Sequence, residues 1–172
     1  MKIRNFSVLW VLLLVTAILV IGPGSVAAKG LKPGNVTFYV SEIEVKGATD
    51  GIPAPETDPT TLSKGYRYKP PGKYDASNPK KWQVSTYMFN PAAMTVNQGD
   101  TVTLRIFVVN GDKHINWVEA PDGSVAVKEH ISNRGREYII TFKAKQAGYY
   151  TLRCDHHDPT MRSVIFSVPS SQ

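Results

Sequence analysis

The chain has 172 residues, a formal net charge of +6 and a single cysteine. This mildly basic balance favours acidic partners but falls far below the charge density of a nucleic-acid-binding protein. With one cysteine the chain has no internal disulfide to form, so a disulfide-stabilised scaffold is excluded.

The N-terminus has the pattern of a secretory signal peptide. Lys2 and Arg4 precede an apolar run over residues 6–22, and small residues follow up to Ala28. This order predicts a signal peptide over residues 1–28, cut after Ala28. Cleavage leaves residues 29–172 as a single exported domain, periplasmic or otherwise extracytoplasmic, with a net charge of +4. The apolar run is at the short edge of a membrane span, so an uncleaved membrane anchor stays open as the alternative.

Beyond the N-terminus the hydrophobic pattern alternates with the period of strands, and no helical period follows. Seven segments rich in Val, Ile, Thr, Tyr and Phe are bounded by turn sequences such as "NQGD" and "NGDK". These predicted strands cover residues 36–45, 82–89, 101–109, 114–119, 137–144, 149–154 and 163–168. Many short strands without intervening helices predict an all-β fold, a Greek-key antiparallel β-sandwich.

Residues 47–81 break this pattern. They hold half of the chain's 12 prolines and almost no aliphatic periodicity, so we expect a long Pro-rich insertion without regular structure. Its aromatic residues, with Trp82 beyond, indicate that part of it packs back onto the sandwich. Between Lys64 and Lys81 it carries six basic residues and one acidic residue, Asp75. Two interpretations stay open: a solvated, partly mobile loop, or a docking surface for an acidic partner.

The stretch "YYTLRCDHHDPTMRSV" places the lone cysteine close to two histidines and a methionine. Taken singly, these residues are typical of a buried structural cysteine, loop histidines and a core methionine. Together, Cys154, His157 and Met161 offer thiolate, imidazole and thioether, a mixture suited to copper. His114, at the start of a predicted strand after "NGDK", adds a second imidazole from a distant segment. The set predicts one copper ion per chain and explains how an exported thiol is protected.

The quoted motifs resemble those of the cupredoxins, the blue copper family that includes plastocyanin, pseudoazurin, amicyanin and azurin. "FNPAAMTVNQGDTVTLRIFVVNGDKHINW" carries the family's Pro, Val, Gly-Asp and first histidine, and "GREYIITFKAKQAGYYTLRCDHHDPTM" carries its aromatic strand and Cys-x-x-His. The resemblance covers residues 82–168. It implies a type 1 copper site with equatorial ligands His114, Cys154 and His157 and with Met161 as the axial ligand.

His156 stands where the family often has proline, which leaves open that it replaces His157 or adds a further ligand. The family often has asparagine directly after the first histidine, where it braces the cysteine loop. Here Ile115 intervenes before Asn116, which leaves those supporting hydrogen bonds open. His130 lies on a predicted turn, where we expect an exposed residue outside the site.

The resemblance implies a one-electron carrier rather than an enzyme, with redox proteins that present an acidic docking surface as partners. No nucleic acid is expected as a partner, and membrane contact only if the N-terminal segment is uncleaved. A more distant resemblance is to nitrosocyanin, a cupredoxin whose copper has an open coordination position for small molecules. That protein has Glu and His where this chain has His114 and Met161, which favours the carrier. A copper-storage or delivery protein is a third interpretation. One cysteine excludes a binuclear purple copper centre, and the absence of His-x-His pairs excludes a multicopper cluster.

Overall fold

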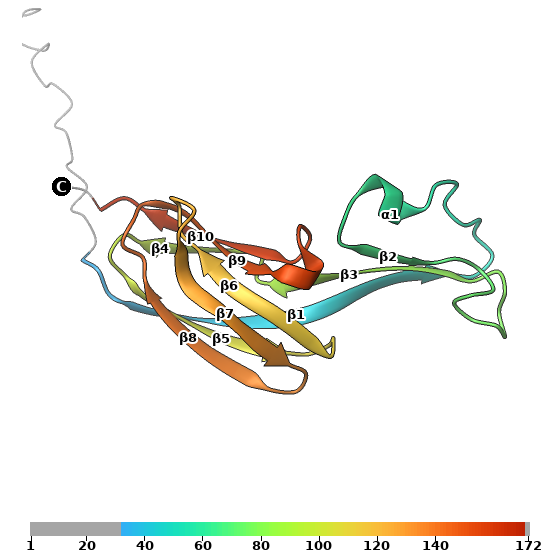
Figure 1. Cartoon of the computed structure of the whole chain (residues 1–172), viewed down its shortest axis with the longest axis horizontal. Helices are drawn as coiled ribbons and strands as arrows, with labels where there is room; N and C mark the ends of the chain where they lie inside the picture. Colours follow the sequence, from blue (N-terminus) through green and yellow to red (C-terminus); the bar gives the residue numbers. More distant parts are fainter. Residues whose placement is uncertain (1–31, 171–172) are drawn as a thin grey trace, which may run out of the picture.

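The computed structural model describes residues 32–170, which form two packed five-stranded sheets (Figure 1). The predicted signal peptide, with its alternative as an anchor, lies outside these residues. Within residues 32–170, no helix is long and apolar enough to cross a membrane.

The first sheet has the order β2-β3-β1-β5-β8 and the second the order β4-β10-β9-β6-β7. The strands of the first sheet are β1 (Asn35–Thr49), β2 (Tyr66–Lys69), β3 (Trp82–Asn90), β5 (Thr101–Val108) and β8 (Glu137–Lys143). Those of the second are β4 (Ala93–Asn97), β6 (Lys113–Glu119), β7 (Val125–Asn133), β9 (Gly148–Cys154) and β10 (Arg162–Val168). Two short helical turns, α1 (Pro59–Leu62) and η1 (Asp155–His157), complete the described structure.

The core lies between the sheets because the strands alternate as the sequence predicts. In β5, every second residue from Val102 to Val108 is buried, and β-branched and aliphatic side chains fill these positions. Leu152 of β9 and Ile165 of β10 face them from the second sheet and are fully buried. The predicted all-β sandwich is therefore confirmed.

Strand direction differs from the prediction in one respect. Both sheets are mixed, because β1 runs parallel to β5 and β4 runs parallel to β10, whereas the other pairs are antiparallel. Alternation reports which face of a strand is buried and carries no information on the direction of its neighbour. An antiparallel sandwich was thus the wrong expectation for these two pairs.

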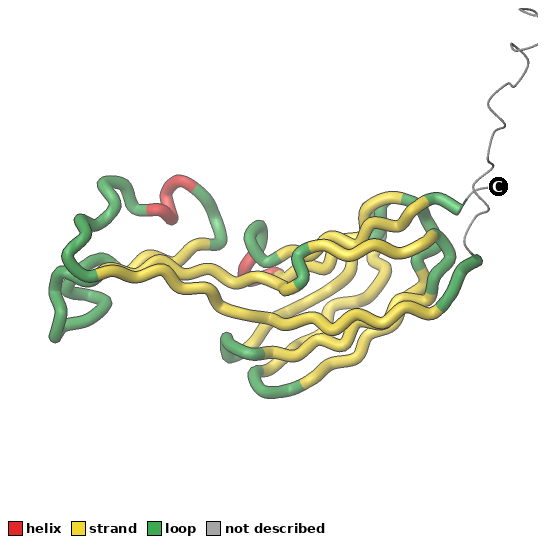
Figure 2. Tube along the Cα trace, turned by 180° about the vertical axis from the view of Figure 1, so that it is seen from behind, coloured by secondary structure: helices red, strands yellow, loops and turns green. Residues whose placement is uncertain are grey.

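A long extension of the first sheet projects beyond the sandwich, and both views show it (Figures 1 and 2). Residues 35–42 of β1 pair with β5 inside the sandwich, and residues 41–49 pair with β3. The second half of β1 thus leaves the sandwich with β3 as its partner, and β2 adds a third strand. We call residues 43–86 the arm.

The arm corrects in part the expectation that residues 47–81 form an insertion without regular structure, because residues 47–49, 59–62 and 66–69 lie in strands or a helical turn. β1 continues to Thr49, Asp58 caps the turn of α1 by accepting a hydrogen bond from the Thr60 amide, and β2 pairs with β3. The arm's aromatic residues contact the arm itself: Tyr74 accepts a hydrogen bond from Gln83, and the Trp82 indole donates to the Ile52 carbonyl. The strand signal was missed because prolines and short pairing segments hide alternation.

Candidate metal centre

The first predicted ligand, His114, is the second residue of β6 and is fully buried. Its Nε2 lies 2.9 Å from the Asn110 carbonyl oxygen. When Nε2 donates its proton to that carbonyl, Nδ1 keeps a free lone pair. The turn before β6 allows this approach because Gly111 has a φ of +81° and a Cβ there would lie 2.4 Å from Nε2. The turn therefore fixes which nitrogen faces the site.

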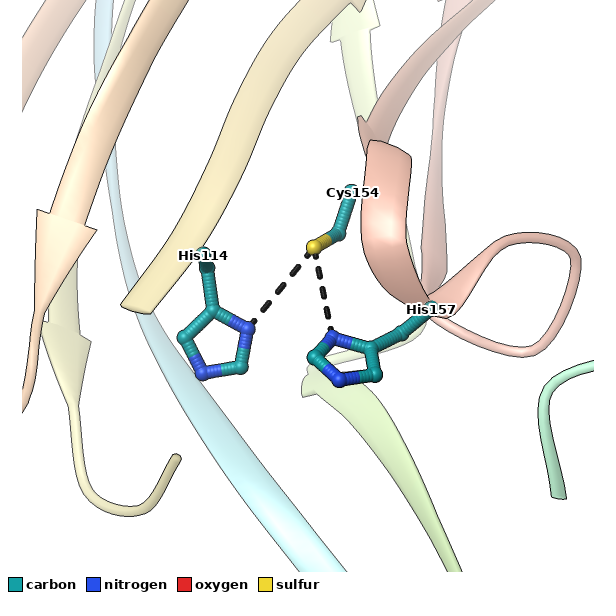
Figure 3. A group of neighbouring side chains, drawn as sticks. All are labelled: His114, Cys154 and His157. Atoms are coloured by element: carbon teal, nitrogen blue, oxygen red, sulfur yellow. Dashed lines mark hydrogen bonds between the residues drawn. The ribbon is translucent and has the colours of Figure 1, made fainter. Parts of the chain in front are cut away.

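Cys154 ends β9 and is fully buried, with its sulfur directed at both imidazoles (Figure 3). The Sγ atom lies 3.7 Å from Nδ1 of His114 and 3.5 Å from Nδ1 of His157. Burial raises the pKa of the thiol, and the backbone amides of Ile115, His156 and His157 oppose that shift by donating to the sulfur. These amides are directed to stabilise a thiolate.

His157 is the last residue of η1, three residues after the strand end that carries the thiol, and is 8% exposed. Its ring packs on the ring of Tyr87 with centroids 4.1 Å apart. Burial, and then the neighbouring His114 and Arg67, lower its pKa to about 4. The imidazole is therefore neutral at physiological pH and has a lone pair to offer a metal.

The three donor atoms of His114, Cys154 and His157 all lie within 4.8 Å of one another. Metal–sulfur and metal–imidazole bonds are about 2.0–2.3 Å long, so two atoms that share one ion lie at most about 4.6 Å apart. Both sulfur–nitrogen distances meet this limit. One thiolate and two imidazoles are a copper donor set, so the residues fit a copper cofactor.

Met161 lies at the other end of the same loop, and its side chain is fully buried. The loop closes on itself through two backbone hydrogen bonds, from Met161 to the His157 carbonyl and from Cys154 to the Met161 carbonyl. Residues 154–161, which we call the ligand loop, thus carry thiolate, imidazole and thioether in a compact turn. The axial role of Met161 stays a prediction.

Comparison with known proteins found no matching family model and no matching curated protein. Solved structures do match in fold. Auracyanin A, a "blue" copper protein from Chloroflexus aurantiacus, is 19% identical, with 46% of this chain and 88% of that chain covered and a TM-score of 0.41. A copper nitrite reductase from Nitrosomonas europaea is 16% identical, with 78% and 42% covered and a TM-score of 0.47. The multicopper oxidase mgLAC is 17% identical, with 79% and 39% covered and a TM-score of 0.47.

This chain therefore spans about two fifths of the length of the two matching enzymes. Identities and TM-scores at this level carry no argument about the site, so its donor atoms decide what kind of site is present. A two-sheet sandwich holds two histidines and a buried cysteine from β6, β9 and η1, followed by a buried methionine. The sandwich and its donor set agree with the resemblance to the cupredoxins that the sequence shows.

Behind the donor cluster lies a buried polar group that sequence reasoning missed. Glu42 of β1 is fully buried, and its Oε1 accepts a hydrogen bond from Asn116, whose amide also lies 2.8 Å from Ser132 Oγ. Its Oε2 has no hydrogen-bond partner among the described residues and lies 3.7 Å from His114 Nε2. Burial raises the pKa of Glu42 to about 7, against the opposing effect of the Asn116 hydrogen bond.

The signal for Glu42 was present in the alternation. Its position shares the inward face with Phe38 and Val40, so a charged residue occupies an apolar position of the strand. The side chain of Asn116 is also accounted for: it bonds Glu42 and Ser132 behind His114. The backbone amide of Ile115 reaches the cysteine sulfur instead.

The other two histidines lie outside the donor cluster. His156 is largely exposed, and its Nδ1 lies 3.3 Å from the Asp155 carboxylate. His130, expected on an exposed turn, instead lies in β7 and is half-buried, and its ring packs 6.2 Å from that of Tyr138. β7 was missed because it is an edge strand with a bulged register and no clean alternation.

Proposed function

We propose that this protein is an exported, mononuclear copper protein that carries single electrons through a type 1 site. His114, Cys154 and His157 would hold the copper, with Met161 as the axial ligand. The observation that supports this proposal is the convergence of one buried sulfur and one nitrogen from each of two imidazoles within 4.8 Å. Bound copper supplies a one-electron Cu(I)/Cu(II) couple, and export rests on the sequence of residues 1–28.

The residues around the donors support electron exchange rather than substrate chemistry. The Asn110 carbonyl orients His114, three backbone amides face the sulfur, and the cysteine side chain is closed to water. A rigid, dry site of this kind keeps its geometry in both oxidation states and reduces the reorganisation that accompanies each transfer. His114 and Met161 are the residues that the resembled electron carriers have at these positions. The nitrosocyanin alternative would have Glu and His there.

The expected result for the copper-loaded protein is reversible gain and loss of one electron per chain, measured by spectroelectrochemistry on the thiolate-to-copper band. The thiolate-to-copper band should return to the same position and intensity after each redox cycle, because the donors are buried. Nitrite and dioxygen, offered with excess reductant, should not be turned over. Catalytic consumption of either compound would contradict the carrier and favour an enzyme.

We further propose that an acidic redox partner docks where the His157 ring approaches the surface. A pocket of about 280 Å³ there is lined by Arg67, Tyr87, Gly111, Asp112, Lys113, His156 and His157. Arg67 comes from the arm and lies over the Tyr87 ring, 5.9 Å from its centroid. Lys80 and Lys81, in contrast, directly precede Trp82, which pairs with the far end of β1. The basic residues between Lys64 and Lys81 are therefore divided: Arg67 lies beside His157, whereas Lys80 and Lys81 lie at the far end of the arm.

If the basic residues beside His157 attract an anionic partner, added salt should affect the rates of anionic and cationic oxidants differently. Oxidation of the reduced protein by hexacyanoferrate(III) should slow as salt shortens the Debye length to about 10 Å at 0.1 M, whereas oxidation by a cationic ruthenium ammine should not slow. The double variant Arg67→Gln/Lys113→Gln should lower the anionic rate at low salt by about tenfold. Stopped-flow kinetics measures these rates.

The matched control removes the same charge from the far end of the arm. Lys80→Gln/Lys81→Gln should leave the rate and its salt dependence close to those of the wild type. Equal effects of the two double variants would show that net charge, and not the pocket beside His157, steers the oxidant.

A further inference from the structure

Thr160 of the ligand loop makes hydrogen bonds to the arm. The Thr160 hydroxyl, one residue before Met161, lies 2.8 Å from the Thr86 hydroxyl and 3.2 Å from the Gly65 carbonyl, both in the arm. It also lies 3.1 Å from the carbonyl of His157. Thr86 in turn lies 2.9 Å from the Gly65 carbonyl. One hydroxyl therefore joins two arm residues to the backbone of a predicted copper ligand.

The two threonine hydroxyls have enough hydrogens to connect the arm to the His157 carbonyl. Each hydroxyl carries one hydrogen, so Thr86 can donate to Thr160 while Thr160 donates to the His157 carbonyl. The Gly65 carbonyl is within reach of both hydroxyls and is the alternative acceptor. All these groups are partly buried, so the loss of one hydroxyl leaves polar atoms without a partner.

Gly65 is shaped for this contact. Its φ is +89°, and a Cβ on it would lie 2.4 Å from Thr160 Oγ1 and 2.8 Å from Thr160 Cγ2. Gly72, also in the arm, has a φ of +79° with no atom within 4 Å of an added Cβ. Both glycines thus have a positive φ that disfavours other residues, but only at Gly65 would a Cβ also collide with a neighbouring side chain.

Tyr87, the residue that follows Thr86 in β3, contacts His157, the predicted ligand. Tyr87 packs on the His157 ring, and successive residues of a strand point to opposite faces. β3 therefore contacts the ring of His157 through Tyr87 and is joined to its backbone carbonyl through Thr86 and Thr160. The hydrogen bonds of Thr160 to Thr86 and Gly65 join residues 74 and 95 positions apart in the sequence.

We propose that the arm positions the ligand loop, and that Thr160 is the positioning residue through which Gly65 and Thr86 fix His157. The inference rests on the proposed copper site. The loop has eight residues and carries three of the four predicted ligands, so a shift of its backbone would move the donors that would hold copper. The arm would thus influence a bound copper ion without contacting it.

The test uses the full chain in metal-free and copper-loaded forms. In Thr160→Val, which keeps the shape of the side chain and removes the hydroxyl, amide hydrogen exchange at residues 155–161 of the metal-free protein should be about fivefold faster. Copper affinity should fall by about tenfold, and the thiolate-to-copper bands should shift. Thr160→Ser, which restores the hydroxyl, should recover the wild-type values, and Thr86→Val should resemble Thr160→Val.

The glycine pair isolates the close contact. Gly65→Ala should change loop exchange and the copper spectrum, whereas Gly72→Ala, its matched control, should change neither. In a Thr160→Ala background, which removes both of the closest atoms, Gly65→Ala should perturb the loop little more than Gly72→Ala does. This cycle assigns the effect to the contact rather than to the backbone of the glycine.

The proposal is overturned if Thr160→Val and Thr86→Val leave loop exchange and spectrum at wild-type values. It is also overturned if they lower only the unfolding temperature, since a purely structural role predicts that result. Failure of Gly65→Ala to fold leaves the two threonine variants to decide. A wild-type protein without a thiolate band would overturn the proposed function, whereas the metal-free exchange would still decide whether the arm holds the loop.

Discussion

Replacement of Cys154 by serine is expected to abolish the intense absorption of the copper-loaded protein while the sandwich stays folded. That band arises from charge transfer between thiolate and copper, and the chain has no other sulfur that can form a thiolate. A serine hydroxyl is slightly smaller than the thiol and fits the same buried position between β9 and η1. The cost in folding stability should be about 1–2 kcal/mol. Visible absorption and far-UV circular dichroism of the loaded variant measure the two effects separately.

The two adjacent histidines supply the control for this experiment. His157→Gly should keep the colour in altered form and bind added imidazole at the copper, because it removes one donor from the cluster. His156→Gly should leave the spectrum nearly unchanged, because His156 lies outside the cluster and faces Asp155. A coloured Cys154→Ser protein, or a reversed pair of histidine effects, would show that the assigned ligands are wrong.

Replacement of Glu42 by glutamine is expected to stabilise the metal-free protein at neutral and alkaline pH. Burial raises the pKa of this carboxyl from 4.5 to about 7 in the folded state. The folded state then binds the proton more tightly than the unfolded state does. The stabilisation is complete below pH 4.5 and is lost as pH rises to about 7, a loss on the order of 3 kcal/mol. Glutamine cannot ionise, keeps an acceptor for Asn116, and so avoids this loss.

The measurement is the difference in free energy of unfolding between wild type and Glu42→Gln, from denaturant titrations between pH 4.5 and pH 8. The difference reduces the contribution of His157, whose pKa burial lowers. Glu44→Gln is the matched control, since Glu44 lies in the same strand and its carboxylate forms an ion pair with Lys46. A difference between wild type and Glu42→Gln that does not grow with pH would mean that the carboxyl is solvated in the folded protein.

Much of the sandwich could be predicted from the sequence because its strands obey a local rule. In β3, β5, β9 and β10, alternate residues are buried, and each strand lies close to its predicted range. The strands that were missed, β2, β4 and β7, are short, Pro-flanked or exposed edge strands. Their stability comes from their neighbours in the sheet, which a window of sequence does not contain.

The sequence by itself determined the donor chemistry: one cysteine, two histidines and a methionine, three of them within eight residues. Only the tertiary structure decided what surrounds them. Glu42 meets Asn116 across 74 positions, and Gly65 meets Thr160 across 95. Likewise, the parallel pairing of β1 with β5 and the projection of the arm follow from how distant segments pack. Residue type and spacing record which atoms can bind a metal, whereas the contacts that orient those atoms form between segments whose proximity exists only once the chain has folded.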